Sequence, residues 1–278
     1  MSNIKEIYKE LNFRPKKSLG QNFLFDHKIL SAIAATVQGG ICIEIGPGPG
    51  GLTWELAQVC SRVVAIEIDE DLCSFLVKAF RDKGNVEIIK GDFLHIDLDA
   101  LFEAHIGEPF KIAANMPYYI TTPIIMKILD SRLPVTKMTL MMQKEVADRI
   151  LAPPGSRDYG VLSVMCQARA KALRICDVSP GAFYPPPQVK STILTFDLYR
   201  ESIIHSHIND FRRCVRAAFS ARRKQIANNI SQGYAMSKDK AQAVLKKASI
   251  DPAARAEQLS VADYDRLCGC INALEPEE

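Results

Sequence analysis

Long apolar runs are absent from this sequence of 278 residues. No stretch of about 18 uncharged apolar residues occurs, so we expect no membrane-spanning helix. The first residues, 1–6, lack the apolar centre of a signal peptide, and we therefore expect a cytoplasmic protein. Hydrophobic residues make up 47 % of the chain, and the mean hydropathy is near zero, as in soluble globular proteins. The length allows one large core and a small second domain.

Typical patterns of metal ligands are also missing. The eight cysteines are scattered and include no C-x-x-C pair, so neither a zinc site nor a disulfide framework is expected, and reduced thiols fit best. Histidine is scarce, with five residues. Its one close pair, His205 and His207, is interpreted as surface. We expect no bound metal.

The chain carries little excess charge of either sign, since its formal net charge is only +3. This value alone does not indicate a nucleic-acid partner. The basic residues are nevertheless clustered, at 14–17 and in a second group comprising Arg212, Arg213, Arg216, Arg222, Arg223 and Lys224. Such clusters are usually solvated faces. Since neither cluster contains an acidic residue, we favour contact with phosphates.

Apolar segments of strand length alternate with helical patterns over the first two thirds of the chain. Strands are predicted near 41–45, 62–67, 86–90, 110–114, 136–142, 172–178 and 190–196. This alternation predicts an α/β fold with a doubly wound parallel sheet, whose ligands bind at the carboxyl ends of the strands. After about residue 199 only helical patterns follow, at 207–219, 221–230, 238–247 and 261–271. We therefore predict one domain over 1–200 and a helical domain over 201–278.

A glycine-rich turn follows the first predicted strand. Gly46, Gly48 and Gly51 match the pattern G-x-G-x-x-G, so a nicotinamide dinucleotide enzyme is one interpretation. Glu67, at the end of the next strand, is placed to accept ribose hydroxyls. Glu44 argues against a dinucleotide, because its negative charge would lie beside a pyrophosphate. A cationic sulfonium ligand tolerates that charge much better.

Polar residues also end the next two strands. Asp92 follows the strand 86–90 and suits an adenine amine, and Asn115 begins the sequence Asn-Met-Pro-Tyr after the strand 110–114. An amide oxygen and a main-chain carbonyl beside Pro117 are acceptors for an exocyclic amine, and the ring of Tyr118 can stack on a flat base. Taken alone, this tetrapeptide is equally compatible with an ordinary strand-to-helix turn.

Together, these strand ends resemble those of the class I S-adenosylmethionine-dependent methyltransferases. Within that class the chain resembles the ribosomal RNA adenine N6-dimethyltransferase family. The matching segments are Leu19–Leu24, Gln143–Arg149, Tyr159–Val164 and the proline-rich Phe183–Val189, and the later segments Phe219–Asn229, Ile250–Pro252 and Arg255–Glu257 look like the small-subunit branch of the family. The resemblance covers about residues 14–267. It implies a seven-stranded Rossmann-like sheet whose last strand is antiparallel, followed by a small all-helical domain.

The resemblance also implies a role for each matching residue. S-adenosylmethionine is expected to lie against the loop of Gly46 and Gly48, with Glu67 on its ribose and Asp92 on its adenine. Three more residues are expected to cover or contact the cofactor: Asn22, Leu24 and Asn115.

The remaining implied roles concern the RNA. Asn115, Pro117 and Tyr118 are expected to hold the target adenine, with Phe183 on its opposite face. Arg222, Arg223 and Lys224 are expected to bind RNA.

Three functions are carried forward. The first is dimethylation, using S-adenosylmethionine, of two adjacent adenosines near the 3′ end of small-subunit (16S) rRNA, either naked or in an immature subunit, by a monomeric enzyme. The second is a relative that dimethylates large-subunit rRNA and confers antibiotic resistance. The third is a non-catalytic RNA-binding assembly factor that keeps the fold as a platform. The segments 222–224 and 255–257 favour the first.

Overall fold

The computed structural model describes residues 16, 20–131 and 133–274. The chain forms two compact units. The first consists of the chain up to Ala147 together with Leu173–Leu198, and the second of Asp148–Ala172 together with the chain from Tyr199 onwards. Our sequence-based division into 1–200 and 201–278 does not include this grouping of 148–172 and stays a prediction.

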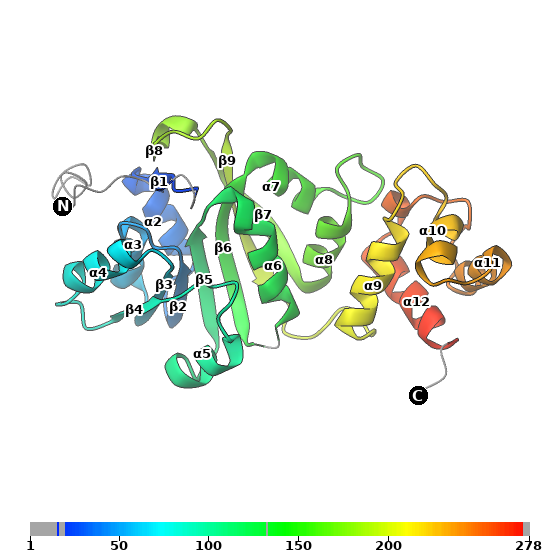
Figure 1. Cartoon of the computed structure of the whole chain (residues 1–278), viewed down its shortest axis with the longest axis horizontal. Coiled ribbons are helices and arrows are strands. Elements are labelled where there is room, and N and C mark those ends of the chain that lie inside the picture. Colours follow the sequence, from blue (N-terminus) through cyan, green and yellow to red (C-terminus); the bar gives the residue numbers. More distant parts are fainter. Residues whose placement is uncertain (1–15, 17–19, 132, 275–278) are drawn as a thin grey trace. The chain divides into compact units, whose positions relative to one another are not determined.

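A seven-stranded sheet is the centre of the first unit (Figure 1). Its strands are β2 (Ile41–Ile45), β3 (Arg62–Glu67), β4 (Val86–Lys90), β5 (Phe110–Asn115), β6 (Val135–Gln143), β7 (Ala170–Val178) and β9 (Ser191–Leu198). Their order is β4-β3-β2-β5-β6-β9-β7. Strands β4 to β6 pair in parallel, whereas β9 pairs antiparallel with β6. The predicted parallel sheet with a late antiparallel strand is therefore confirmed.

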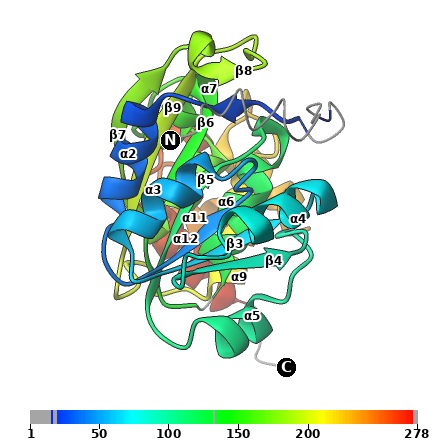
Figure 2. The same ribbon diagram turned by 90° about the vertical axis from the view of Figure 1, so that its left-hand side faces the viewer.

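Helices pack on both faces of this sheet. They are α2 (His27–Thr36), α3 (Gly51–Val59), α4 (Glu70–Ala79), α5 (Leu98–His105) and α6 (Thr121–Asp130). The helix α7 (Lys144–Leu151) contains residues of both units. Cys42 and Val63 share a buried cluster with Leu56 of α3, whereas Ile43 faces Ile128 of α6. Neighbouring residues of a strand point to opposite faces, so β2 is covered on both sides and is buried along its whole length. Figure 2 brings α2, α3 and α4 to the front.

A small ladder joins the start of the described chain to its proline-rich loop. Strand β1 (Phe23–Leu24) pairs antiparallel with β8 (Phe183–Tyr184), which follows the short turn η3 (Pro180–Ala182). Leu24 and Phe183 are directly opposite in this ladder and both are buried in the cluster beneath α2 and α3. The ladder thereby fixes residues 20–24, which we call the lead-in segment, against the sheet domain.

The second unit is helical and has its own core. It contains α8 (Val161–Arg169), α9 (Ile208–Ala218), α10 (Ile226–Gly233), α11 (Lys238–Lys247), the short turn η4 (Ala256–Gln258) and α12 (Val261–Asn272). The rings of Tyr159 and Tyr264 both pack on Phe219, at centroid distances of 6.3 and 6.0 Å. Asp265 of α12 accepts hydrogen bonds from the backbone N–H groups of His205 and Ser206, which fixes the segment before α9.

One predicted helix begins later than expected. The pattern 221–230 predicted a continuous helix, but α10 begins at Ile226, and residues 220–224 form turns. The buried side chain of Asn229 stabilises these turns by donating to the carbonyls of Ala218 and Ala221, at 2.6 and 3.1 Å. The basic triplet 222–224 therefore lies on a turn before the helix.

Candidate functional site

A cavity of about 230 Å³ lies where β2, β3, β4 and β5 end. This is the switch point of the sheet, because the strand order reverses between β2 and β5. The predicted residues that line the cavity are Asn22, Leu24, Gly46, Gly48, Glu67, Asp92, Asn115 and Pro117. Residues up to 95 positions apart in the sequence, from Asn22 to Pro117, are thus brought to one cavity.

The glycine-rich loop forms one wall of the cavity. Gly46 and Gly48 have φ angles of +67° and +57°, a conformation that side chains disfavour. A Cβ on Gly46 would meet no atom within 4 Å, whereas one on Gly48 would lie 2.8 Å from the ring of Phe23. The loop therefore leaves open space beside Gly46, and at Gly48 its backbone packs closely against the lead-in segment.

Glu67 is buried and strongly held at the end of β3. Its Oε2 accepts the N–H of Gly48 at 3.0 Å, and its Oε1 accepts those of Ile68 and Asp69 at 2.9 Å each. Burial raises the pKa of the Glu67 carboxyl, and these three hydrogen bonds oppose the rise. Since a carboxylate has about four lone-pair sites, one direction on Oε2 is left for a ligand hydroxyl.

Glu44 lies at the floor of the same cavity, two residues before Gly46. It is 1 % exposed, and its Oε2 has no hydrogen-bond partner in the described part of the chain. Burial raises the pKa of the Glu44 carboxyl to about 8, against the influence of the Thr53 hydroxyl, and the charge of Glu67 adds to the rise. A buried acid of this kind favours a ligand that brings a positive charge.

Asp92, two residues after the end of β4, also lines the cavity. Its Oδ1 accepts the N–H of Leu94 at 2.9 Å, and its Oδ2 lies 2.7 Å from Nδ1 of His95. Burial alone would raise the pKa of Asp92, but these two contacts lower it below the usual range. The loop is further stabilised by Lys127, whose Nζ donates to the carbonyls of Leu94 and Ile96. The side chain of Asp92 is thus an ionised acceptor.

Asn115, the last residue of β5, faces the cavity with its amide unengaged: it forms no hydrogen bond with any residue that the structure describes. The carbonyl of Pro117 is already used by the N–H of Ile120 at 3.3 Å and the hydroxyl of Thr121 at 3.4 Å. The carbonyl of Met116 is therefore the better acceptor for a bound amine.

The aromatic residues lie differently from what the sequence indicated. Tyr118 and Phe183 are not among the residues that line the cavity, whereas Tyr119 is, and it is 62 % exposed. The hydroxyl of Tyr118 lies 2.6 Å from Oγ of Ser191 on β9, and Phe183 is 5 % exposed in the core beneath α2. The stacking roles of Tyr118 and Phe183 therefore stay predictions. From the sequence, only one of the adjacent Tyr118 and Tyr119 was expected to face the site, and we assigned the role to Tyr118, because only the turn η2 (Tyr118–Ile120) decides which ring turns to the site.

The predicted RNA-binding residues differ in their surroundings. Arg222 donates to the backbone carbonyls of Arg157 and Tyr159, at 2.5 and 3.2 Å, and so stabilises a loop within the second unit. The side chains of Arg223 and Lys224 are exposed and form no hydrogen bond or ion pair in the described part of the chain. Of the cluster 14–17, residues 14, 15 and 17 lie outside the described residues.

Comparison with known proteins identifies the family. A model of the family described as ribosomal RNA adenine dimethylase matches residues 12–273. The chain belongs to this family. It is 40 % identical to the "Ribosomal RNA small subunit methyltransferase A" of Clostridioides difficile, over 96 % of this chain and 94 % of that protein. It is 42 % identical to the protein of the same name from Geobacter metallireducens, over 94 % of this chain and 97 % of that protein.

Two solved structures have the same fold as this chain. A dimethyladenosine transferase from Plasmodium falciparum superposes with a TM-score of 0.77 and 26 % identity, covering 90 % of this chain and 98 % of that one. The 23S rRNA methyltransferase ErmE superposes with a TM-score of 0.67 and 25 % identity, covering 90 % and 99 %. The predicted family and fold class are confirmed.

The described residues lack two features that are typical of other classes of protein. Among the described residues, no helix has both the length and the apolar character needed to cross a bilayer. The same residues contain no group of three or more histidine, cysteine or acidic side chains placed to hold a metal ion.

Proposed function

We propose that this chain transfers methyl groups from S-adenosylmethionine to the N6 amines of two adjacent adenosines near the 3′ end of small-subunit (16S) rRNA, during ribosome biogenesis. The observation that carries the proposal is the single cavity that joins Asn115 to the glycine-rich loop and Glu67. Family membership supports the reaction, and the names of the relatives at 40 and 42 % identity support the small subunit as the substrate.

The residues of the cavity fit S-adenosylmethionine. Open space beside Gly46 leaves room for the amino-acid portion of the cofactor, and Oε2 of Glu67 keeps an acceptor site for its ribose. Asp92 is an ionised acceptor for the adenine amine. Glu44 keeps its proton in the free enzyme, so a cationic ligand beside its orphaned, buried oxygen would favour ionisation of the carboxyl, whereas a pyrophosphate would oppose it. When bound, S-adenosylmethionine supplies a methyl group carried on a positively charged sulfur.

The protein's part in the reaction is to prepare the adenine amine. The amine's lone pair is delocalised into the purine ring, so it is a weak nucleophile. Asn115 Oδ1 and the carbonyl of Met116 accept the two amine hydrogens, which favours localisation of the lone pair on nitrogen. Tyr119 lies at the rim of the cavity, where its exposed ring offers a face on which the base can stack.

No side chain in the site is needed as a strong base. The proton that the amine loses can leave to water once the nitrogen has become cationic. The catalytic contribution is therefore orientation and electrostatic stabilisation by groups that are already in place.

Label transfer to ribosomal particles tests the proposed function. The purified chain is incubated with tritiated S-adenosylmethionine and either small or large subunits that lack dimethyladenosine, and the RNA is digested to nucleosides. We expect label in N6,N6-dimethyladenosine from the small subunit only. Label confined to the large subunit would establish the antibiotic-resistance type of activity instead, and absence of label from both would indicate a non-catalytic assembly factor. Deproteinised rRNA in a parallel reaction shows whether an assembled subunit is required.

We also propose that the enzyme is a cytoplasmic monomer. Light scattering during size-exclusion chromatography tests the oligomeric state, and a mass twice that of the chain would contradict it.

A further inference from the structure

The lead-in segment touches both halves of the proposed site. A Cβ on Gly20 would lie 3.1 Å from the ring of Tyr119 and 3.3 Å from Pro117, so the backbone of Gly20 packs directly on the substrate motif. Three residues later, the ring of Phe23 packs on Gly48 of the cofactor loop. Any group that fixes this segment therefore influences both the cofactor loop and the substrate motif.

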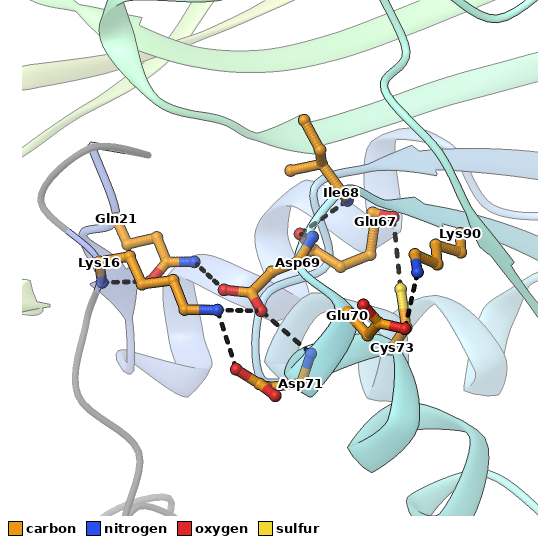
Figure 3. A network of polar contacts seen from close by, with 9 residues as sticks. All are labelled: Lys16, Gln21, Glu67, Ile68, Asp69, Glu70, Asp71, Cys73 and Lys90. Atoms are coloured by element: carbon orange, nitrogen blue, oxygen red, sulfur yellow. Dashed lines mark hydrogen bonds and ion pairs between the residues drawn. The ribbon is translucent and has the colours of Figure 1, made fainter.

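A polar cluster fixes the segment to the start of α4. Nζ of Lys16 lies 2.8 Å from Oδ1 of Asp69 and 2.9 Å from Oδ2 of Asp71, and Gln21 Nε2 donates to Oδ2 of Asp69 at 3.1 Å. Figure 3 shows Lys16 and Gln21 both pointing toward Asp69. In addition, the backbone N–H of Lys16 donates to Oε1 of Gln21 at 2.7 Å. We call Lys16, Gln21 and Asp69 the clasp.

Asp69 is unusual among the acids of this surface because its side chain is fully buried, whereas that of Asp71 is 71 % exposed. Burial alone would raise the pKa of Asp69, but the hydrogen bonds from Lys16 and Gln21 lower it. A buried carboxylate without its cationic partner is costly, so the ion pair with Lys16 differs from an ordinary surface pair.

Asp69 connects the clasp to the cofactor site. Its backbone N–H donates to Oε1 of Glu67 at 2.9 Å, and the other oxygen of Glu67 accepts the N–H of Gly48 at 3.0 Å. A continuous series of hydrogen bonds thus joins Lys16 through Asp69 and Glu67 to the glycine-rich loop. A shift of Asp69 would change the orientation of the carboxylate that faces the ribose.

We propose that Lys16 and Gln21 are positioning residues, which hold Asp69 and the lead-in segment so that Glu67 and Phe23 keep their places against bound S-adenosylmethionine and slow its dissociation. The inference rests on the proposed function, because it assumes that this cofactor occupies the cavity. Gln21 lines this cavity, whereas Lys16 is not among the residues that line it.

The test compares Lys16→Met with Lys90→Met. Lys90 forms an equally short ion pair, 2.8 Å, with Glu70 at the start of α4, but both members of this pair are exposed and neither contacts the lead-in segment. Each substitution removes one positive charge at the start of α4. Lys16→Met removes the ion pairs with Asp69 and Asp71, and Lys90→Met removes the ion pair with Glu70. Dissociation of tritiated S-adenosylmethionine is followed after addition of excess unlabelled cofactor, at low and high salt.

We expect the cofactor to dissociate about fivefold faster from Lys16→Met than from the wild type, and to dissociate from Lys90→Met at the wild-type rate. Lys16→Arg should restore slow dissociation, because it keeps the charge. Salt should speed dissociation from the wild type and from Lys16→Arg but not from Lys16→Met. Asp69→Asn, which keeps an acceptor for the N–H of Asp71, should resemble Lys16→Met.

Equal dissociation rates for the wild type, Lys16→Met and Lys90→Met would overturn the inference and leave the proposed function intact. A similar acceleration by both methionine variants would also overturn it, since that would be a general effect of charge. Absence of cofactor binding by the wild-type chain would instead contradict the proposed function.

Discussion

Replacement of Glu44 by glutamine should change how the stability of the free enzyme depends on pH. Burial raises the pKa of this carboxyl from an ordinary 4.5 to about 8. The native state therefore keeps the proton over a pH range in which the unfolded chain has lost it. The stability that this group contributes is fully present below pH 4.5 and is lost as the pH rises through 8.

The size of the effect follows from the two pKa values. One pKa unit corresponds to 1.36 kcal/mol, so the difference between 4.5 and about 8 corresponds to roughly 5 kcal/mol when the full range is crossed. Between pH 5 and pH 9 we expect Glu44→Gln to gain about 4 kcal/mol of unfolding free energy relative to the wild type. Glutamine has nearly the same shape and does not titrate, so its own burial cost is the same at both pH values.

Urea unfolding of both proteins at pH 5, 7 and 9, without cofactor, measures this difference. All other titrating groups are shared, so they cancel when the two proteins are compared at each pH. A constant difference between the two free energies across the range would refute the argument, because it would mean that Glu44 titrates alike in the native and unfolded states.

Three further predictions concern the glycine loop and the basic turn. Gly48→Ala should lower the unfolding free energy by about 1–2 kcal/mol through its positive φ. It should also weaken cofactor binding, because the new methyl group displaces the ring of Phe23. Thermal melting measures the first effect and equilibrium dialysis the second, and wild-type values for both would contradict the close packing. Arg222→Ala should lower unfolding free energy by about 1–3 kcal/mol, since it leaves two backbone carbonyls without their donor. Arg223→Ala and Lys224→Ala should leave stability unchanged but each reduce the salt dependence of RNA binding by about one ion. Lower stability with an unchanged salt dependence would show that these two side chains make no phosphate contact.

Strand ends were the most predictable part of the site. Glu67, Asp92 and Asn115 each follow a short apolar run, and the carboxyl ends of parallel strands necessarily meet at one edge of the sheet. The glycine loop was equally predictable, because its spacing is local. These features depend on a few neighbouring residues and on a repeating architecture, so sequence patterns carry them.

Contacts between distant residues could not be predicted in the same way. Lys16 and Asp69 are 53 positions apart, and nothing in the basic cluster around Lys16 indicates that an acid at the start of α4 binds it. The same limit applies to Phe183, whose ladder with Leu24 places it in the core. The basic turn is a third case. The buried side chain of Asn229 donates to the carbonyl of Ala218 and so stabilises turns where the pattern predicted a helix, and Arg222 donates to the backbone carbonyl of Arg157.

Single-turnover methylation by Asn115→Ala tests the central claim most directly, that an unengaged amide beside the cofactor cavity activates the adenine amine. Affinity for S-adenosylmethionine is measured on the same samples. We predict nearly unchanged cofactor affinity and a methylation rate on small subunits that is lower by about 10²–10³-fold, which corresponds to about 3–4 kcal/mol of transition-state stabilisation. A variant that methylates at the wild-type rate would contradict the account.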